Sequence, residues 1–358
     1  MHNYSLENSI LFMHIDIVQS PSYNSVRCNK NFRMEMLSML VSEAYKAWQN
    51  EYWTVSGALL ENTIRGYISV FEHHLLPCIG DNDIGNINYE ALQSYYNSLL
   101  ANGMCQKTIR NINQALQSLL IWCWQKKWIS KPEDNNIIIP KRRGHNDISN
   151  TITEKEYQSL KTVLAGQYKY AIEFIANTGI RLEEIALTLD CLDFKGKNIK
   201  ICKAVKRTYT DFDKHKTKLC LSKYLKSSAS YRKIPITPNV EKIIMLQLDM
   251  LKRNHIESSY LFPNTLGCLI EPRNLTRTFY ENLKKVGLSK RGVHSLRKLY
   301  IYRMVKNGMS AKTLQKIVGH EQYSTTMKYY LNITDEDVNE EAFAVYDNMK
   351  DKYFSRDN

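Results

Sequence analysis

The sequence contains no apolar run long enough to cross a membrane. A membrane-spanning helix needs roughly 18–20 consecutive apolar residues, and no stretch of the 358-residue chain approaches that length. The N-terminus lacks a charged segment leading into an apolar core, so no secretory signal peptide is expected. Internal repeats and low-complexity tracts are absent as well. We therefore expect a soluble, cytoplasmic protein with no membrane partner.

The eight cysteines form neither a CxxC pair nor a Cys/His spacing typical of a zinc site. Several lie in apolar stretches, as Cys123 does between Trp122 and Trp124. Buried free thiols in a reducing compartment explain this distribution. The sequence therefore predicts no metal site.

The chain does carry a large excess of positive charge. Its formal net charge is +13, which favours an anionic partner such as nucleic acid. Many basic proteins bind no nucleic acid, so the charge alone does not decide. The length suggests two domains, each large enough for its own hydrophobic core.

The segment 29–140 predicts a bundle of four or five helices, whereas residues 1–28 form either a tail or a small accessory element. Asn62 is expected to cap the first helix, and Pro77 and Gly80 to end it. Apolar residues recur at helical spacing along three stripes. These are Ile64, Tyr67, Ile68, Phe71 and Leu75; Ala91, Leu92, Tyr95, Tyr96 and Leu99; and Ile109, Ile112, Leu116, Leu119, Leu120 and Cys123.

Basic side chains outside these stripes can face a phosphate backbone. In the bundle they are Lys107, Arg110, Lys126 and Lys127, and in the segment 141–150 they are Lys141, Arg142 and Arg143. The segment 141–150 predicts a linker because prolines precede it and polar residues fill it. A cationic linker can follow DNA between two domains, and a solvated connector explains the same residues equally well.

The segment 151–358 predicts a second domain, which makes the whole chain mainly α with a small antiparallel β-sheet, an α+β fold. Thr153 and Glu156 form a capping-box pattern that opens a helix. Further helices are expected up to Thr178, over Leu182–Leu189, and from Val240 onward.

Three short strands are expected within this second domain. They cover Ile199–Ala204, Leu219–Leu225 and Arg232–Ile236. The stretch Lys206–Lys218 is charged and poorly periodic, so we expect an inserted loop there.

Two arginines, two histidines and one tyrosine follow one another in this domain as Arg181, His294, Arg297, His320 and Tyr329. Guanidinium groups bind phosphate oxygens bidentately, histidine exchanges protons near neutral pH, and a phenol can act as a nucleophile. Together they can hold and attack a phosphodiester.

Each of these residues taken singly is more often structural. Glu184, three residues after Arg181, can orient its guanidinium, although an ordinary helix ion pair explains the same spacing. His294 and Arg297 share one helical face. His320 follows Gly319 and is expected at a turn or at a helix N-terminus, where backbone N–H groups attract anions.

The order and spacing of these residues resemble the tyrosine recombinases, the phage integrase family, over nearly the whole chain. The motifs are Thr178-Gly179-Ile180-Arg181 with Glu184, His294-Ser295-Leu296-Arg297, Leu314 through Gly319-His320, and Thr325-Thr326 before Tyr329. The resemblance implies a helical core-binding (SAM-like) DNA-binding domain at 29–140 and a catalytic domain at 151–358. It also implies a C-terminal exchange segment, which docks either on a neighbouring subunit or on its own domain.

The family also uses a lysine on a β-hairpin, a few residues before an Arg-x-x-Pro strand. Here Lys226 fits, with Lys226 ending one strand and Arg232 starting the next. The competing candidates are Lys223, Lys214, Lys216 and Lys218. The resemblance implies that this lysine protonates the leaving 5′ oxygen.

The resemblance further implies a metal-free, cofactor-free reaction in which Tyr329 attacks the scissile phosphate and forms a 3′-phosphotyrosyl link. Arg181, Arg297 and His320 would hold the phosphate, and His294 would assist proton transfer. Tyr330 is the adjacent phenol, and the nine-residue interval from His320 favours Tyr329.

The implied function is site-specific recombination, with integration or excision of a mobile element. The implied partners are double-stranded DNA with specific recombination sites, further copies of the chain in a homotetramer on that DNA, and an accessory DNA-bending or directionality protein. A type IB-like topoisomerase and a catalytically silent DNA-binding regulator on the same scaffold are the alternatives.

Overall fold

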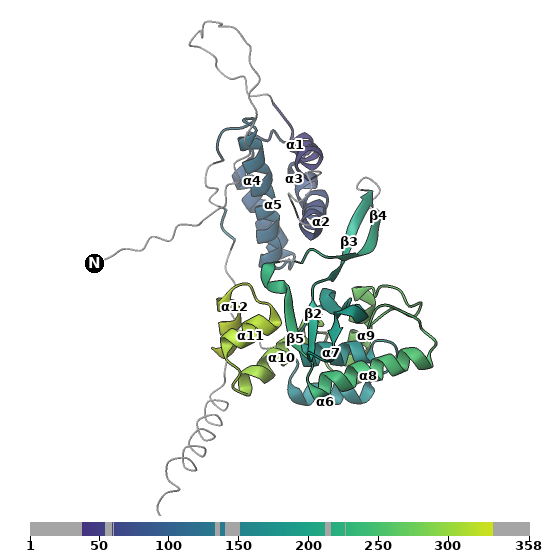
Figure 1. Ribbon diagram of the computed structural model, residues 1–358. Coiled ribbons are helices and arrows are strands. Elements are labelled where there is room, and N and C mark those ends of the chain that lie inside the picture. Colours follow the sequence, from purple (N-terminus) through teal and green to yellow (C-terminus); the bar gives the residue numbers. More distant parts are fainter. Residues whose placement is uncertain are drawn as a thin grey trace, which may run out of the picture.

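The computed structural model describes residues 38–53, 59, 61–132, 137–139, 151–211, 216–225 and 227–331. The chain is mainly helical and carries small antiparallel sheets, so the predicted α+β class is confirmed. Figure 1 shows two groups of elements, an N-terminal group of helices and a C-terminal group of helices and strands. Several predicted features lie outside the described residues, namely 1–28, Lys141, Arg142, Arg143, Lys214, Lys226 and the C-terminal exchange segment.

The described N-terminal group consists of helices packed around one core. They are α1 (Val41–Trp48), α2 (Glu61–Val70), α3 (Leu76–Ile79), α4 (Tyr89–Ala101) and α5 (Gln106–Gln125), with the π-helical turns η1 (Gln49–Trp53) and η2 (Phe71–Leu75). The third predicted stripe is confirmed, because its residues are buried along α5. Burial of an apolar face of this length is the main stabilising contribution to such a bundle.

The first predicted helix differs from the prediction at Asn62 and at Pro77. Helix α2 begins at Glu61, so Asn62 lies inside it and does not cap it. Pro77 does not end the run either, because η2 leads directly into α3 and Pro77 lies in the first turn of α3. A proline removes one N–H donor from a continuous helical run, and here the π-helical turn η2 precedes it, where the regular i→i−4 hydrogen bonds are already interrupted. The helical run ends at Ile79, just before Gly80, as predicted.

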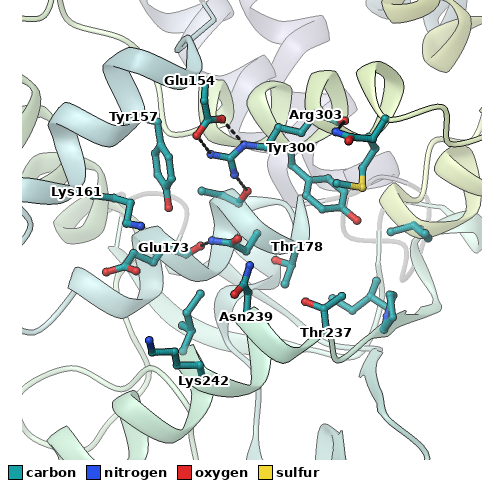
Figure 2. A pocket seen from close by; sticks show the side chains of 18 of the residues that line it. Glu154, Tyr157, Lys161, Glu173, Thr178, Thr237, Asn239, Lys242, Tyr300 and Arg303 are labelled. Atoms are coloured by element: carbon teal, nitrogen blue, oxygen red, sulfur yellow. Dashed lines mark hydrogen bonds and ion pairs between the residues drawn. The ribbon is translucent and has the colours of Figure 1, made fainter. Parts of the chain in front are cut away.

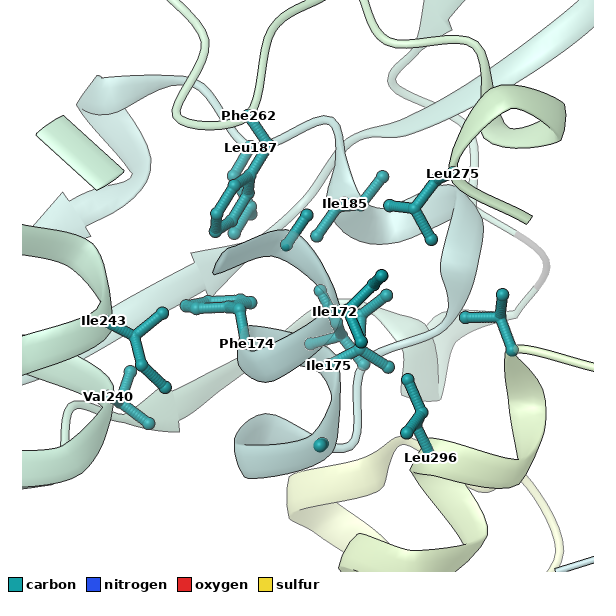
Figure 3. Close-up of a cluster of buried hydrophobic side chains, with 14 of the residues drawn as sticks. Ile172, Phe174, Ile175, Ile185, Leu187, Val240, Ile243, Phe262, Leu275 and Leu296 are labelled. Carbon is teal, nitrogen blue, oxygen red and sulfur yellow. The ribbon is translucent and has the colours of Figure 1, made fainter. Parts of the chain in front are cut away.

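The C-terminal group packs its helices around a second core. The helices are α6 (Glu154–Val163), α7 (Lys169–Thr178), α8 (Pro238–Arg253), α9 (Pro272–Lys285), α10 (His294–Lys306), α11 (Ala311–Val318) and α12 (Tyr323–Tyr330). Helix α7 lies at the centre of this core, with Ile172, Phe174 and Ile175 fully buried (Figure 3). The capping box at the start of α6 is confirmed, since Thr153 and Glu156 bond reciprocally.

The strands form two separate sheets. Strands β1 (Leu192–Asp193), β2 (Asn198–Ile201) and β5 (Arg232–Pro235) make a three-stranded antiparallel sheet in the order β1-β2-β5, and β3 (Ala204–Asp211) and β4 (Lys216–Ser222) make a two-stranded ribbon. The predicted inserted loop Lys206–Lys218 is therefore wrong. A ribbon with little buried surface needs no alternation of apolar residues, so its strands left no period-2 signal. In Figure 1 the ribbon lies beside α2, and β3 contacts α2.

The predicted helix Leu182–Leu189 is also wrong. Two short 3-10 turns, η4 (Leu182–Ile185) and η5 (Leu189–Cys191), replace it. Between them Thr188 forms an antiparallel bridge with Tyr260, and the Leu187 carbonyl accepts a hydrogen bond from Leu261 N at 2.8 Å. Pairing with this distant segment competes with a continuous helix, which local sequence does not reveal.

Cysteine burial follows the prediction only in part. Cys123 and Cys191 are buried thiols, as expected, whereas Cys78, Cys105 and Cys268 are exposed. Across the described ranges, no helix combines the length and apolarity needed to span a lipid bilayer.

Candidate active site

Two glycine-terminated helices meet at the predicted site. Gly179 ends α7 with φ 64° and Gly319 ends α11 with φ 72°. Glycine adopts this left-handed conformation readily and commonly ends a helix. The carbonyl oxygens of the last turn have no partner within the helix and are therefore open to donors from elsewhere.

Three arginines donate to three successive carbonyl oxygens at the end of α11. Arg232 Nε donates to Ile317 O at 2.6 Å, Arg297 Nη2 donates to Val318 O at 2.7 Å, and Arg181 Nη2 donates to Gly319 O. Arg297 also donates to Gly179 O, so it joins the ends of α7 and α11. The negative end of the helix dipole favours this gathering of cations.

Glu184 is the carboxylate at the centre of the arginine cluster, which we define as Arg181, Arg232 and Arg297. It is only 2% exposed and accepts from Arg181 Nη1 at 2.8 Å and from both terminal nitrogens of Arg232 at 2.9 and 2.8 Å. Burial raises its pKa, but the bonds and charges of Arg232 and Arg181 outweigh burial and lower the pKa of Glu184. One carboxylate against three guanidinium groups leaves two positive charges in excess.

The predicted contact between Arg181 and Glu184 is confirmed, although in a different setting. Arg181 is the N-cap of the 3-10 turn η4, and its backbone N also donates to Glu184 Oε2 at 2.8 Å. About a quarter of the Arg181 side chain remains exposed. Arg181 is thus fixed at its base while part of its guanidinium group is open to a ligand.

Arg297 is buried in the first turn of α10, with 1% of its surface exposed. Burial and the charge of Arg181 lower its pKa to about 9, so it stays charged at neutral pH. Its Nε has no hydrogen-bond partner among the described residues. A buried donor without an acceptor is costly, and an anion that reaches this N–H would satisfy it.

His320 lies in the turn between α11 and α12. The predicted turn is confirmed, whereas a helix N-terminus is wrong, because α12 begins only at Tyr323. The Nδ1 atom of His320 lies 3.0 Å from Thr326 Oγ1. Burial and the charges of Arg297 and Arg181 lower the pKa of His320 to about 3. Its ring is therefore neutral at pH 7.

His294 opens α10 one turn before Arg297, so the two residues lie on one face as predicted. His294 keeps more of its surface exposed than Arg297 does. Partial burial and the charges of Arg297 and Lys298 lower the pKa of His294 to about 4. At pH 7 this ring is also neutral and able to accept a proton.

The structure distinguishes Tyr329 from Tyr330. Tyr330 donates its hydroxyl hydrogen to Met309 O, whereas within the described part of the chain the Tyr329 hydroxyl has no hydrogen-bond partner. The Tyr329 ring stacks on His320 with centroids 6.3 Å apart and an interplanar angle of 14°. Burial raises the pKa of Tyr329, and the positive charge of Arg297 opposes this rise, so the two groups interact electrostatically.

The lysine candidates are placed only in part. Lys216 and Lys218 lie on β4 toward the tip of the ribbon, where Lys216 is opposite Asp211. Lys223 follows the end of β4 at the base of the ribbon. Strand β5 begins at Arg232, as predicted. Lys226 lies outside the described residues, so its role as the proton donor to the leaving 5′ oxygen stays a prediction.

The basic candidates of the bundle do not form one patch. Lys107 and Arg110 lie in the first turns of α5, and Lys126 and Lys127 follow its last residue. A 20-residue helix is roughly 30 Å long, so the two pairs lie at opposite ends. Lys126 also forms an ion pair with Glu51 and lies over the Trp122 ring at 5.4 Å.

A cavity of about 760 Å³ shares a wall with the site but contains none of the predicted site residues. Thr178, Tyr300 and Ile317 line it, together with polar side chains of α6, α7, α8 and α10 (Figure 2). The ion pair of Arg303 with Glu154 lies at this cavity. The candidate chemistry is therefore on the arginine side of α7 and not in this cavity.

Sequence reasoning missed Arg232 as a member of the site. It used this residue only as the start of a strand, yet Arg232 contacts both Glu184 and the end of α11. The available signal was its place in the Arg-x-x-Pro motif. Nothing local in that motif indicates a partner 48 or 85 residues away.

Substituting Gly319 by alanine is expected to destabilise the protein more than substituting Gly308. Both glycines have a positive φ, 72° and 74°, which costs a non-glycine residue about 1–2 kcal/mol. A Cβ at Gly319 would lie 2.8 Å from Ala229 O and 3.0 Å from Arg232 Cδ, whereas one at Gly308 meets no atom within 4 Å.

Thermal unfolding of the two variants measures this difference. Gly319→Ala should lose about 1–3 kcal/mol more than Gly308→Ala because of the added overlap. Equal losses would show that the space around Gly319 is not tight.

Acid is expected to destabilise the wild-type protein through His320. The folded pKa of about 3 lies below the ordinary value of about 6.5, so the unfolded state takes up the proton first. The free energy of unfolding contributed by neutral His320 is present above pH 6.5 and decreases as the pH falls, by up to about 1.4 kcal/mol per pH unit.

Urea unfolding at pH 7, 6 and 5 compares the wild type with His320→Asn, which keeps a polar partner for Thr326. The wild type should lose stability more steeply over this range. Parallel pH dependences would contradict the buried, neutral state of His320. Carboxylates interfere little here, since they titrate mainly below pH 5.

Comparison with known proteins agrees with this geometry. The phage integrase family model matches residues 150–336. Curated relatives include a tyrosine recombinase XerC-like protein of Caldanaerobacter subterraneus subsp. tengcongensis, 25% identical over 260 residues, or 68% of this chain and 66% of the relative. The integrase of Staphylococcus phage L54a is 27% identical over 174 residues, or 46% of this chain and 48% of the relative. The chain thus spans about two thirds of the first relative and half of the second.

Two solved structures share the fold. The integrase of transposon Tn1549 in complex with transposon right-end DNA has a TM-score of 0.69 and 19% identity, covering 86% of this chain and 100% of that chain. A lambda integrase dimer bound to a COC' core site has a TM-score of 0.61 and 14% identity, covering 81% and 95%. Because the family model matches more than half of the chain, this protein belongs to the phage integrase family, the tyrosine recombinases.

Proposed function

We propose that the protein is a site-specific DNA recombinase that cuts and rejoins DNA through a bond between Tyr329 and a 3′ phosphate. The observation that carries this proposal is the pairing of an excess positive charge with a phenol that has no hydrogen bond to any described residue. The buried Nε–H of Arg297 likewise has no partner among the described residues, and the charge of Arg297 acts on the pKa of Tyr329. Such a site suits an anion that is attacked by a tyrosine.

The roles implied by the family resemblance fit this geometry, and we propose them for this chain. Arg181 and Arg297 hold the non-bridging oxygens of the scissile phosphate, with His320 beside them. Fixed positive charge of this kind lowers the barrier by a few kcal/mol per donor, because the oxygens gain charge in the transition state. The excess charge of the cluster disfavours any bound cation, and the chemistry proposed here needs no metal.

Proton transfers complete the proposed reaction. The Tyr329 oxygen forms a bond to phosphorus as the bond to the 5′ oxygen breaks. Neutral His294 assists removal of the phenolic proton, and its pKa rises when an anion enters the site. Lys226 gives a proton to the leaving 5′ oxygen. Attack by a 5′-OH reverses these steps and releases Tyr329.

The proposed partner is double-stranded DNA that carries specific recombination sites. Residues 29–140 would serve as the core-binding domain and 151–358 as the catalytic domain, joined by the linker 141–150. A lambda integrase tetramer has been solved on a Holliday junction, which supports a homotetramer for this chain. We also propose that an accessory DNA-bending or directionality protein assists the reaction. The protein would act in the cytoplasm and move a mobile element.

A covalent protein–DNA adduct tests the proposed function. The wild-type protein is incubated in EDTA with nicked duplexes taken from the ends of the genetic element that encodes it. Denaturing electrophoresis detects the adduct, and peptide mass spectrometry locates the phosphotyrosine. Adduct formation at Tyr329 at one site supports recombination. Cutting without sequence preference would indicate a topoisomerase, and binding without an adduct would indicate a silent regulator.

A further inference from the structure

Arg232 is a buried arginine of the cluster to which the proposed chemistry gives no task. It begins β5, and 5% of its side chain is exposed. Four hydrogen bonds hold its guanidinium group, to Glu184 twice, to Ile317 O and to Ser230 O. Since a guanidinium has five N–H donors, one is left for any ligand. Arg232 is therefore poorly suited to hold a phosphate.

Arg181 differs from Arg232 in this respect. Its guanidinium group donates once to Glu184 and once to Gly319 O, which leaves three of five donors. Its side chain is also 25% exposed, against 5% for Arg232. Of the two arginines that share Glu184, one faces the opening of the site and the other faces the protein.

We propose that Arg232 is a positioning residue that keeps Arg181 available for the scissile phosphate, an inference that rests on the proposed function. Its planar fork binds both oxygens of Glu184 at 2.9 and 2.8 Å. Glu184 thereby shares its charge between two guanidinium groups. Without Arg232 the Glu184 carboxylate would bind Arg181 alone. The carboxylate would then compete with the scissile phosphate for the guanidinium group of Arg181.

Arg232 also supports the turn that carries His320. Its Nε bonds the carbonyl of Ile317, two residues before Gly319, and its Cδ lies 3.0 Å from the position that a Cβ of Gly319 would take. The bond to Ser230 O fixes the end of the segment that precedes β5. One side chain thus connects Glu184, the end of α11 and the lysine-bearing segment.

The test compares Arg232→Met with the matched control Arg291→Met. Arg291 is also well buried, binds Glu156 through both terminal nitrogens at 2.6 and 2.8 Å and donates to Thr151 O. It lies outside the proposed site. Both substitutions remove a doubly bonded arginine from the same domain, so both are expected to lower thermal stability.

Single-turnover cleavage of a nicked duplex at saturating protein separates the two variants. Arg232→Met should slow adduct formation by about 10–100-fold, the usual cost of losing a group that orients a catalytic residue, with DNA affinity nearly unchanged. Arg291→Met should stay within about threefold of the wild-type rate, since surface and structural changes away from a site act mainly on stability. Equal rates for both variants would overturn the proposal.

Glu184→Gln distinguishes a positioning role of Arg232 from a purely structural one, because only a positioning role predicts opposite effects on the cleavage rate in the two backgrounds. In the wild-type background it should slow cleavage, because Arg181 loses its partner. In the Arg232→Met background it should restore cleavage by about threefold or more, because it removes the competing charge, and such reversal is a strong coupling between neighbours. A further loss in the double variant would overturn the proposal.

Arg232→Lys covers the case in which Arg232→Met does not fold. A lysine keeps the charge but cannot form the two parallel hydrogen bonds of a guanidinium group to Glu184. We therefore expect Arg232→Lys to cleave DNA slowly as well. Wild-type cleavage by Arg232→Lys would overturn the proposal. A wild-type protein that forms no adduct would instead contradict the proposed function and is recognised before any variant is compared.

Discussion

Tyr329→Phe is expected to form no covalent adduct with DNA. The substitution removes the oxygen that attacks the phosphate, and loss of a nucleophile commonly costs more than about 10⁴-fold in rate. Folding and DNA binding should be retained. The Tyr329 hydroxyl has no hydrogen-bond partner within the described residues, and a phenylalanine ring keeps the stacking on His320. The measurement is adduct yield on a nicked duplex at a protein concentration that saturates binding.

Tyr330→Phe is the control for this variant. It removes the bond from the Tyr330 hydroxyl to Met309 O, which should lower stability by about 1 kcal/mol and leave cleavage near the wild-type rate. The pair therefore separates loss of chemistry from loss of structure. An adduct of wild-type yield in Tyr329→Phe would contradict the assignment of the nucleophile.

Arg297→Lys is expected to have the next largest effect. Lysine cannot reach Gly179 O and Val318 O together, as the Arg297 fork does, and it offers no planar pair of donors to a phosphate. We expect cleavage to slow by about 10²–10³-fold, the usual cost of one lost donor to a developing anion. DNA affinity should change little, because Arg297 is 1% exposed and surface charges dominate binding.

Arg303→Lys is the matched control for Arg297→Lys. Arg303 lies on the same helix and also donates to a carbonyl of α7, that of Ala176 at 3.1 Å. Its other partner is Glu154, away from the site. Arg303→Lys should be less stable than the wild type but should cleave DNA at nearly the wild-type rate. Cleavage by Arg297→Lys as fast as by Arg303→Lys would refute a direct role of Arg297.

The sequence predicted which side chains lie near one another better than it predicted their geometry. The fold brings His294, Arg297, Arg181 and Tyr329 close enough to His320 or to one another for their charges or rings to interact, and their catalytic roles stay predictions. The contact of Arg181 with Glu184 and the shared face of His294 and Arg297 also followed, because both depend on residues three apart. Local spacing determines such contacts.

The remaining geometry depends on residues distant in the chain. Gly319 ends α11, so the glycine before His320 marks the end of one helix and not the start of the next. The bonds from Arg181, Arg232 and Arg297 to that helix end span 138, 85 and 21 residues. The ribbon β3–β4 was missed for a related reason, since its strands lack the buried face that produces an alternating pattern.

The shared anchorage of three arginines makes assembly of the catalytic centre cooperative. Their acceptors are successive carbonyls of one helix end, so fraying of that single turn removes one hydrogen bond from each of the three guanidinium groups at once. Local opening of a helix end is a low-energy fluctuation in folded proteins. The three arginines are thus weakened together, so a cluster with only some of its guanidinium groups in place is kept scarce.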